Sequence, residues 1–135
     1  MDGVILTPLK QINNPKGDIF HAMKKSDDGY DGFGEAYFST VYKDDIKGWK
    51  KHTKMTLNLV VPMGSIEFVV YDEFEQEFFS VVLSQDNYQR LTVKPSQWMA
   101  FQGVGDSNML LNLASIEHDP DEAVNVDLKE IKYEW

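Results

Sequence analysis

Short runs of β-branched and aromatic residues recur along the chain, and most are bounded by Gly, Pro, Asn or Asp. Such runs predict β-strands, and no long segment keeps the 3.6-residue period of a helix. Eight strands at this spacing predict an all-β fold, either a sandwich or a barrel. The predicted strands are Gly3–Pro8, Gly34–Tyr42, Met55–Val61, Ser65–Tyr71, Glu77–Leu83, Arg90–Val93, Trp98–Gln102 and Met109–Ile116.

Polar segments connect the predicted strands. Pro62–Gly64 has the residues of a hairpin turn, Asp72–Glu77 is an acidic strand connection, and Gly103–Ser107 is a flexible loop. The polar, acidic segment Asp119–Trp135 ends in aromatic residues, so we expect it to wrap the surface as a tail.

Length and composition limit the class of protein. The 135 residues fit a single domain, residues 1–135, and the 42% hydrophobic and 13% aromatic content is that of a folded chain. The net charge of −9 disfavours a nucleic-acid partner, because phosphates repel an acidic surface. The chain has no cysteine, and its apolar runs are too short to cross a membrane. We therefore expect a cytoplasmic protein.

The basic segment Lys47–Lys54 carries the most informative chemistry. Lys50 and His52 are two residues apart, so in an extended segment both side chains leave the same face, while Trp49 points the other way. A cationic neighbour disfavours protonation of both groups, which would make either one a possible base or carbonyl polariser. Alternatively, the four lysines of this segment form an exposed basic turn. Both interpretations stay open at this point.

Several segments in order resemble one enzyme family. These segments are Asn14–Gly17, Gly34–Thr40, Lys47–His52, Val93–Trp98 and Ile131–Trp135. Together they resemble the sugar-nucleotide cupins, namely the dTDP-4-dehydrorhamnose 3,5-epimerases and the dTDP-4-keto-6-deoxyhexose 3,4-ketoisomerases. The resemblance spans almost the whole chain.

This resemblance implies a double-stranded β-helix, the jelly-roll barrel of cupins, with a nucleotide-linked sugar in the mouth of the barrel. It also implies a homodimer that exchanges N-terminal strands. In the epimerases a His removes the proton next to a C4 ketone, a cation stabilises the enolate, and a Tyr returns a proton from the opposite face. No cofactor is implied, because the ketone itself acidifies the neighbouring carbons.

The resemblance places the family's catalytic positions on residues that often differ in type. The base His falls on Lys50, the second His on His52, the reprotonating Tyr on Trp98, and the His that follows it on Met99. Because an indole has no suitably acidic proton, the proton would be returned by the group that removed it, giving isomerisation, or by water or Tyr71. The predicted catalytic residues are therefore Lys50, His52 and Tyr71.

The same carry-over predicts a substrate-binding set. The nucleotide-contacting Arg of the family falls on Lys16, and a Glu falls on His21. Lysines would meet the pyrophosphate as point charges, and an indole would stack on a sugar or base. The predicted substrate-binding residues are Lys16, His21, Lys47, Trp49, Lys54 and Trp98. The positions that hold metal in other cupins retain only His52, so we predict no metal.

Three functions are compatible with the sequence. The first is a cofactor-independent epimerase or ketoisomerase of a nucleotide-linked 4-keto-6-deoxy sugar. The second is a catalytically degenerate cupin that binds a sugar nucleotide or glycan, or supports a partner enzyme of polysaccharide biosynthesis. The third, an acidic interaction domain, rests only on net charge.

Overall fold

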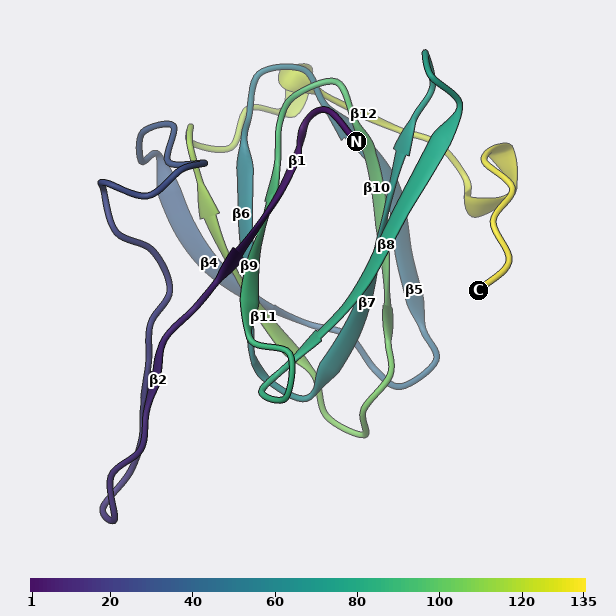
Figure 1. Cartoon of the computed structure of the whole chain (residues 1–135). Coiled ribbons are helices and arrows are strands. Elements are labelled where there is room, and N and C mark those ends of the chain that lie inside the picture. The colour runs from purple at the N-terminus through teal and green to yellow at the C-terminus, as the bar shows by residue number, and fades with distance from the viewer.

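A computed structural model describes residues 1–135 as two antiparallel five-stranded sheets packed face to face (Figure 1). The first sheet has the order β1 (Val4–Pro8), β9 (Gln89–Val93), β6 (Leu57–Met63), β11 (Met109–Ala114) and β4 (Glu35–Thr40). The second has the order β12 (Ala123–Asn125), β5 (Ile46–His52), β10 (Trp98–Gly103), β7 (Ser65–Asp72) and β8 (Glu77–Ser84). The predicted all-β jelly roll is confirmed.

Short elements complete the chain. A two-stranded hairpin, β2 (Gln11–Ile12) and β3 (Ile19–Phe20), projects away from the two sheets (Figure 1). Two single-turn 3₁₀ helices, η1 (Pro120–Glu122) and η2 (Leu128–Glu130), flank β12. None of the helices could span a membrane.

Alternating residues of facing strands form the core between the sheets. Leu57, Leu59 and Val61 of β6 meet Phe68 and Val70 of β7, and each is at most 5% exposed. Full burial of one such side chain stabilises the fold by roughly 1.5–3 kcal/mol. The period-2 pattern of these strands therefore fixes which face of each sheet is internal.

The segment Pro62–Gly64 is a turn between the sheets, and the predicted hairpin is wrong. It joins β6 of the first sheet to β7 of the second, and these two strands are not paired. Gly64 has a φ of 81°, and a Cβ at this position would lie 2.1 Å from the carbonyl oxygen of Ser107. A tight glycine turn looks alike in sequence whether the next strand pairs back or crosses to the other sheet.

Each sheet has a covered outer face. On the first sheet, the fully buried Arg90 donates to Asn58 Oδ1 at 2.9 Å, to Asp27 Oδ2 at 3.1 Å and to the Asp28 carbonyl at 2.9 Å. The amide of Lys24 and the Arg90 guanidinium hold the pKa of Asp27 below its ordinary value. On the second sheet, the segment after β12 packs over Trp49 and Trp98, as expected for the predicted tail.

Candidate active site

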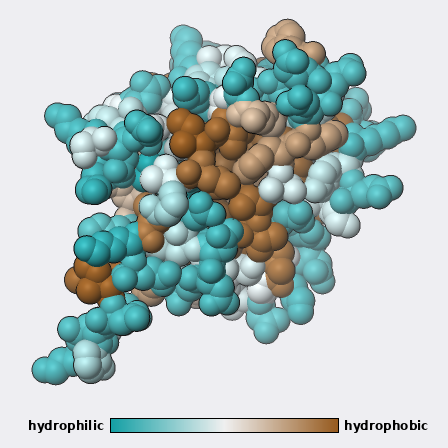
Figure 2. All heavy atoms as spheres, in the orientation of Figure 1, coloured by the Kyte–Doolittle hydropathy of each residue, from teal (hydrophilic) through white to brown (hydrophobic).

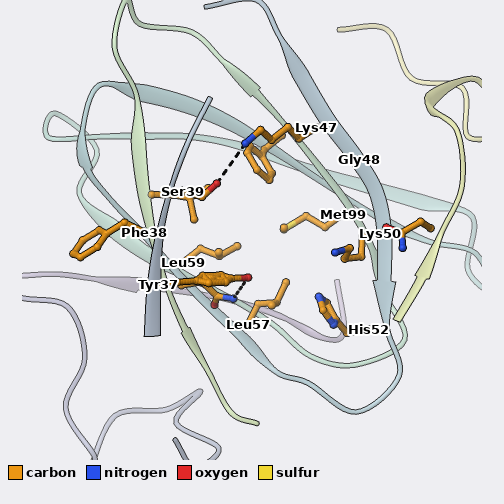
Figure 3. A pocket seen from close by; sticks show the side chains of 14 residues that line it. Tyr37, Phe38, Ser39, Lys47, Gly48, Lys50, His52, Leu57, Leu59 and Met99 are labelled. Atoms are coloured by element: carbon orange, nitrogen blue, oxygen red, sulfur yellow. Dashed lines mark hydrogen bonds between the residues drawn. The ribbon is translucent and has the colours of Figure 1, made fainter. Parts of the chain in front are cut away.

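A cavity of about 440 Å³ lies between the sheets and is lined by side chains from six strands (Figure 3). Its floor is apolar, formed by Leu57, Leu59, Met99, Phe101 and Leu110. The remaining lining residues are Tyr37, Phe38, Ser39, Lys47, Gly48, Lys50, His52, Asn112 and Asn125. Three of the predicted site residues, Lys47, Lys50 and His52, therefore line one cavity.

A local irregularity in β5 brings Lys47 to the same cavity as Lys50. Lys50 pairs with Met99 of β10, whereas Lys47 pairs with Phe101, so two residues of β5 lie opposite Ala100 alone. This extra residue is a β-bulge, which changes the face that the following side chains occupy. Without it, residues three apart would point to opposite faces of the strand.

His52 is paired with the carboxylate of Glu122. Its Nδ1 atom contacts Glu122 Oε1, and the two side chains are 13% and 1% exposed. Glu122 ends η1, directly before β12, whose Ala123 pairs with His52 of β5. The strand pairing therefore delivers the carboxylate to the imidazole.

Glu122 is also held by backbone amides. Its Oε2 atom accepts hydrogen bonds from the amides of Thr53, Lys54 and Met55 at 3.2, 3.0 and 3.1 Å. Burial alone would raise the pKa of Glu122, but the hydrogen bonds from His52 and from the amides outweigh it and hold the pKa below its ordinary value. An ionised carboxylate at Nδ1 leaves Nε2 as the nitrogen that is free to exchange protons.

Tyr37 of β4 extends into the cavity from the sheet opposite His52 (Figure 3). Its hydroxyl oxygen accepts a hydrogen bond from Asn112 Nδ2 at 3.0 Å. Asn112 is 1% exposed and its Oδ1 accepts from the amide of Asn58 at 3.2 Å, which fixes the orientation of its side chain. A phenol and an imidazole thus face one cavity from two sides.

The two cavity lysines are exposed at its rim. Lys47 Nζ donates to the Thr40 carbonyl at 2.6 Å and lies 3.5 Å from Ser39 Oγ (Figure 3). Lys50 pairs with Asn125 of β12 on one side and Met99 on the other. The side chain of Lys50 is exposed at the cavity rim, where it could meet a negatively charged group of a ligand.

Three predicted aromatic site residues lie on the outer face of the second sheet. Trp49 and Trp98 are 1% and 6% exposed and form one buried cluster, against which Tyr71 packs. The Trp98 indole donates to Glu73 Oε2 at 2.8 Å, and Lys51 Nζ lies 4.9 Å from its ring centre. None of the three lines the cavity. Strand alternation turns all three away from the interior, so the structure does not bring them together with Lys50 and His52.

The other predicted binding residues also lie outside the cavity lining. Lys16 lies in the exposed turn between β2 and β3. His21 follows β3, where its amide donates to the Lys10 carbonyl at 3.0 Å and its carbonyl accepts from the Tyr88 hydroxyl at 2.8 Å. The side chain of Lys54 is exposed. Its backbone amide, not its ammonium group, contributes to the site by donating a hydrogen bond to Glu122.

Sequence reasoning missed Tyr37, Asn112, Glu122 and Asn125. The alternation within Gly34–Tyr42 carried a usable signal for Tyr37, since every second residue of an edge strand faces the interior. No signal in the sequence singled out Glu122, because it is one of many acidic residues in a segment interpreted as a tail. No three His, Cys, Asp or Glu side chains are grouped so that they could hold a metal ion.

The jelly roll with a cavity between its sheets defines the chain as a cupin. Neither the protein-family models nor the curated proteins match it. Among solved structures, it is 31% identical to a dTDP sugar isomerase from Desulfovibrio desulfuricans G20, covering 99% of this chain and 91% of that one with a TM-score of 0.93.

A second similar structure is a mutant of the 3,4-ketoisomerase QdtA from Thermoanaerobacterium thermosaccharolyticum, in complex with TDP-4-keto-6-deoxyglucose. It is 25% identical, with 92% and 88% of the two chains covered and a TM-score of 0.80. The rmlC epimerase of Mycobacterium tuberculosis, 16% identical over 93% and 69% of the chains with a TM-score of 0.81, shares the fold. The chain belongs to the dTDP-sugar isomerase family of cupins, which confirms the resemblance seen in its sequence.

Proposed function

We propose that the protein isomerises or epimerises a nucleotide-linked 4-keto-6-deoxy sugar by proton abstraction and enolate formation. The observation that carries this proposal is the His52–Glu122 pair, which faces Tyr37 across an anion-attracting cavity. The similarity to a dTDP sugar isomerase and to a ketoisomerase with a bound 4-keto-6-deoxy sugar supports the substrate class.

His52 is the base in this proposal. With Nδ1 bound to Glu122, its Nε2 atom accepts the proton from the carbon next to the ketone. The carboxylate keeps the imidazole in one orientation and stabilises the imidazolium that forms. The electron pair of the broken C–H bond moves to the ketone oxygen and gives an enolate.

Lys50 stabilises that enolate. Its ammonium is on the same face of β5 as His52, and a positive charge near a developing oxyanion lowers the barrier to its formation. Lys47, three residues earlier and also at the cavity rim, is placed to meet the pyrophosphate as a point charge. The structure therefore supports different roles for these two lysines.

Tyr37 takes the role first assigned to Tyr71, that of returning a proton. Its hydroxyl lies on the other side of the cavity from His52 (Figure 3). The hydrogen bond donated by Asn112 would stabilise negative charge on the phenolic oxygen after the proton has left. A proton returned by Tyr37 to the carbon that lost one, from the opposite face, gives epimerisation. Ketoisomerisation instead requires the C3 hydroxyl to pass its proton to the C4 oxygen while His52 returns its proton to C4.

The apolar floor suits the 6-deoxy group. Leu57, Leu59, Met99 and Leu110 offer no hydrogen-bond partner to a hydroxyl, so a methyl group is better accommodated there. Thymidine diphosphate is the nucleotide we propose, because the related isomerase and ketoisomerase use or bind thymidine-linked sugars by name.

A homodimer is also part of the proposal. An isolated two-stranded hairpin is marginally stable, yet β2 and β3 extend from the body with Ile19 55% exposed and Lys16 in their turn. Figure 2 shows a band of apolar side chains on the face where β1 and β8 lie, and Leu6 and Val81 of these strands are only partly buried. We propose that a second copy of the chain covers this β2–β3 hairpin, which is called the arm below. We also propose that the protein is a single-domain, cytoplasmic enzyme of polysaccharide biosynthesis.

Solvent exchange tests the proposed chemistry. In deuterated water, dTDP-4-keto-6-deoxyglucose should gain deuterium next to its ketone with the native protein and not with His52→Gln. Lys132→Gln, which changes an exposed residue outside the cavity lining, is the control and should behave as native. Binding by calorimetry without any exchange would contradict catalysis and support the alternative, a cupin that only binds the sugar nucleotide.

A further inference from the structure

We propose that Tyr133 and Trp135 position the catalytic pair from the outer face of the second sheet. They pack with Trp49 and Phe78, and these four residues are called the aromatic clasp below. The inference rests on the proposed function and adds to it positioning residues that lie outside the cavity.

Strand β12, which brings Glu122 and Asn125 to the site, has few stabilising contacts of its own. β12 has three residues, occupies the edge of its sheet and pairs only with β5. Glu122 directly precedes it, and Asn125 is its last residue and lines the cavity. Short edge strands open easily, so further contacts must hold β12 against β5.

The chain supplies those contacts directly after β12. Val126 and Trp49 exchange two backbone hydrogen bonds, from Val126 N to the Trp49 carbonyl at 3.1 Å and from Trp49 N to the Val126 carbonyl at 3.2 Å. The Trp49 indole then donates to the Leu128 carbonyl at 3.3 Å. Trp49 therefore fastens the segment after β12 to the strand that carries Lys50 and His52.

Aromatic packing completes the attachment. The ring centres of Trp49 and Trp135 are 6.1 Å apart, those of Phe78 and Tyr133 5.2 Å, and those of Tyr133 and Trp135 5.0 Å. Such pairs stabilise beyond the apolar area that they bury. The clasp thus joins the segment Val126–Trp135 to both β5 and β8.

Electrostatic attraction contributes little to holding this segment. Between Glu117 and Glu134 the chain is rich in carboxylates, and none of them forms an ion pair with a lysine or an arginine; the contact of Glu122 with His52 is the one such pairing in this region. Apolar contacts must therefore balance the repulsion between like charges. Loosening the clasp would let β12 move and would separate Glu122 from His52, although no side chain that lines the cavity has been substituted.

Trp135→Ala tests the clasp through two readouts. The first is the downfield NMR resonance of the proton between His52 Nδ1 and Glu122, which needs no substrate and which Glu122→Gln should remove. The second is turnover of dTDP-4-keto-6-deoxyglucose. We expect Trp135→Ala to lose or broaden the resonance and to lower kcat about 10- to 100-fold, as misplacement of a catalytic group does, with a smaller change in KM.

Two variants serve as controls. Trp135→Phe keeps an aromatic ring and should restore the resonance and most of the turnover. Phe74→Ala removes an aromatic side chain that is 81% exposed and outside the clasp, so both readouts should stay native. All variants are measured well below their thermal midpoints, and Trp135→Leu replaces Trp135→Ala if the latter does not fold.

The outcomes separate the two proposals. A folded Trp135→Ala or Trp135→Leu protein with a native resonance and a native kcat would overturn the clasp. The clasp proposal would also be overturned if the kcat of the variant falls only in proportion to its folded fraction. If the native protein shows the resonance but no turnover, the proposed function fails, and the NMR comparison still decides the role of the clasp.

Discussion

His52 lines the cavity and is partly exposed there, and the buried carboxylate of Glu122 contacts its imidazole from the other side. Removing its imidazole by His52→Gln should reduce kcat at least about 100-fold, since a positioned base contributes roughly 10²–10⁴-fold. Substrate affinity should change much less, because the lysines at the rim remain. Steady-state kinetics measure both values, and a kcat within threefold of the native one would assign the base to another residue.

Glu122 links the site to stability. Its pKa in the folded protein is below its ordinary value, so its contribution is fully present above the ordinary Glu pKa of about 4.3 and is lost as pH falls toward the folded value. Glu122→Gln removes charge-assisted hydrogen bonds and should cost about 1.5–3 kcal/mol at pH 7. Urea unfolding at pH 7 and pH 4 should show a smaller difference between native and variant at pH 4. An equal difference at both pH values would contradict the ionic role.

At the scale of the strand, the bulge in β5 depends on Gly48. A Cβ there would lie 2.4 Å from Ala100 Cβ, and the φ of 152° also disfavours other residues. Gly48→Ala should destabilise the fold by about 1–3 kcal/mol, as overpacking does, and weaken substrate binding by displacing Lys47. The control is Gly17→Ala, whose φ of 135° is similarly unfavourable but whose added Cβ meets nothing within 4 Å. Equal losses for both variants in thermal unfolding would show that the clash is unimportant.

The sequence predicted the strands whose apolar residues alternate, because packing between two sheets requires that pattern. It did not predict β5 as a strand, since Lys47, Lys50 and His52 face the cavity and break the apolar pattern. From the two-residue period of an extended segment alone, the sequence predicted His52 and Lys50 on one face of that segment and Trp49 on the other. It could not predict Glu122, because strand pairing across 70 residues brings that carboxylate to His52.

At the scale of the whole molecule, the proposed homodimer rests on the arm formed by β2 and β3. The hairpin has only two residues in each strand, and its Ile19 remains 55% exposed. Covering such side chains with a second copy would supply the apolar burial that a hairpin of this size lacks. Native protein should therefore show the mass of a dimer in light scattering.

A charge on the arm should oppose that association. Ile19→Lys places an ammonium where the partner would bury a side chain, and burial of an unpaired charge is strongly unfavourable. The variant should have a monomeric mass at concentrations where native protein is dimeric, whereas Phe74→Lys, at an exposed position on the turn between β7 and β8, should remain a dimer. If the arm also brings Lys16 to the partner's substrate, Lys16→Ala should raise KM while leaving the mass unchanged. A monomeric native protein that turns over substrate would contradict the exchange of N-terminal strands.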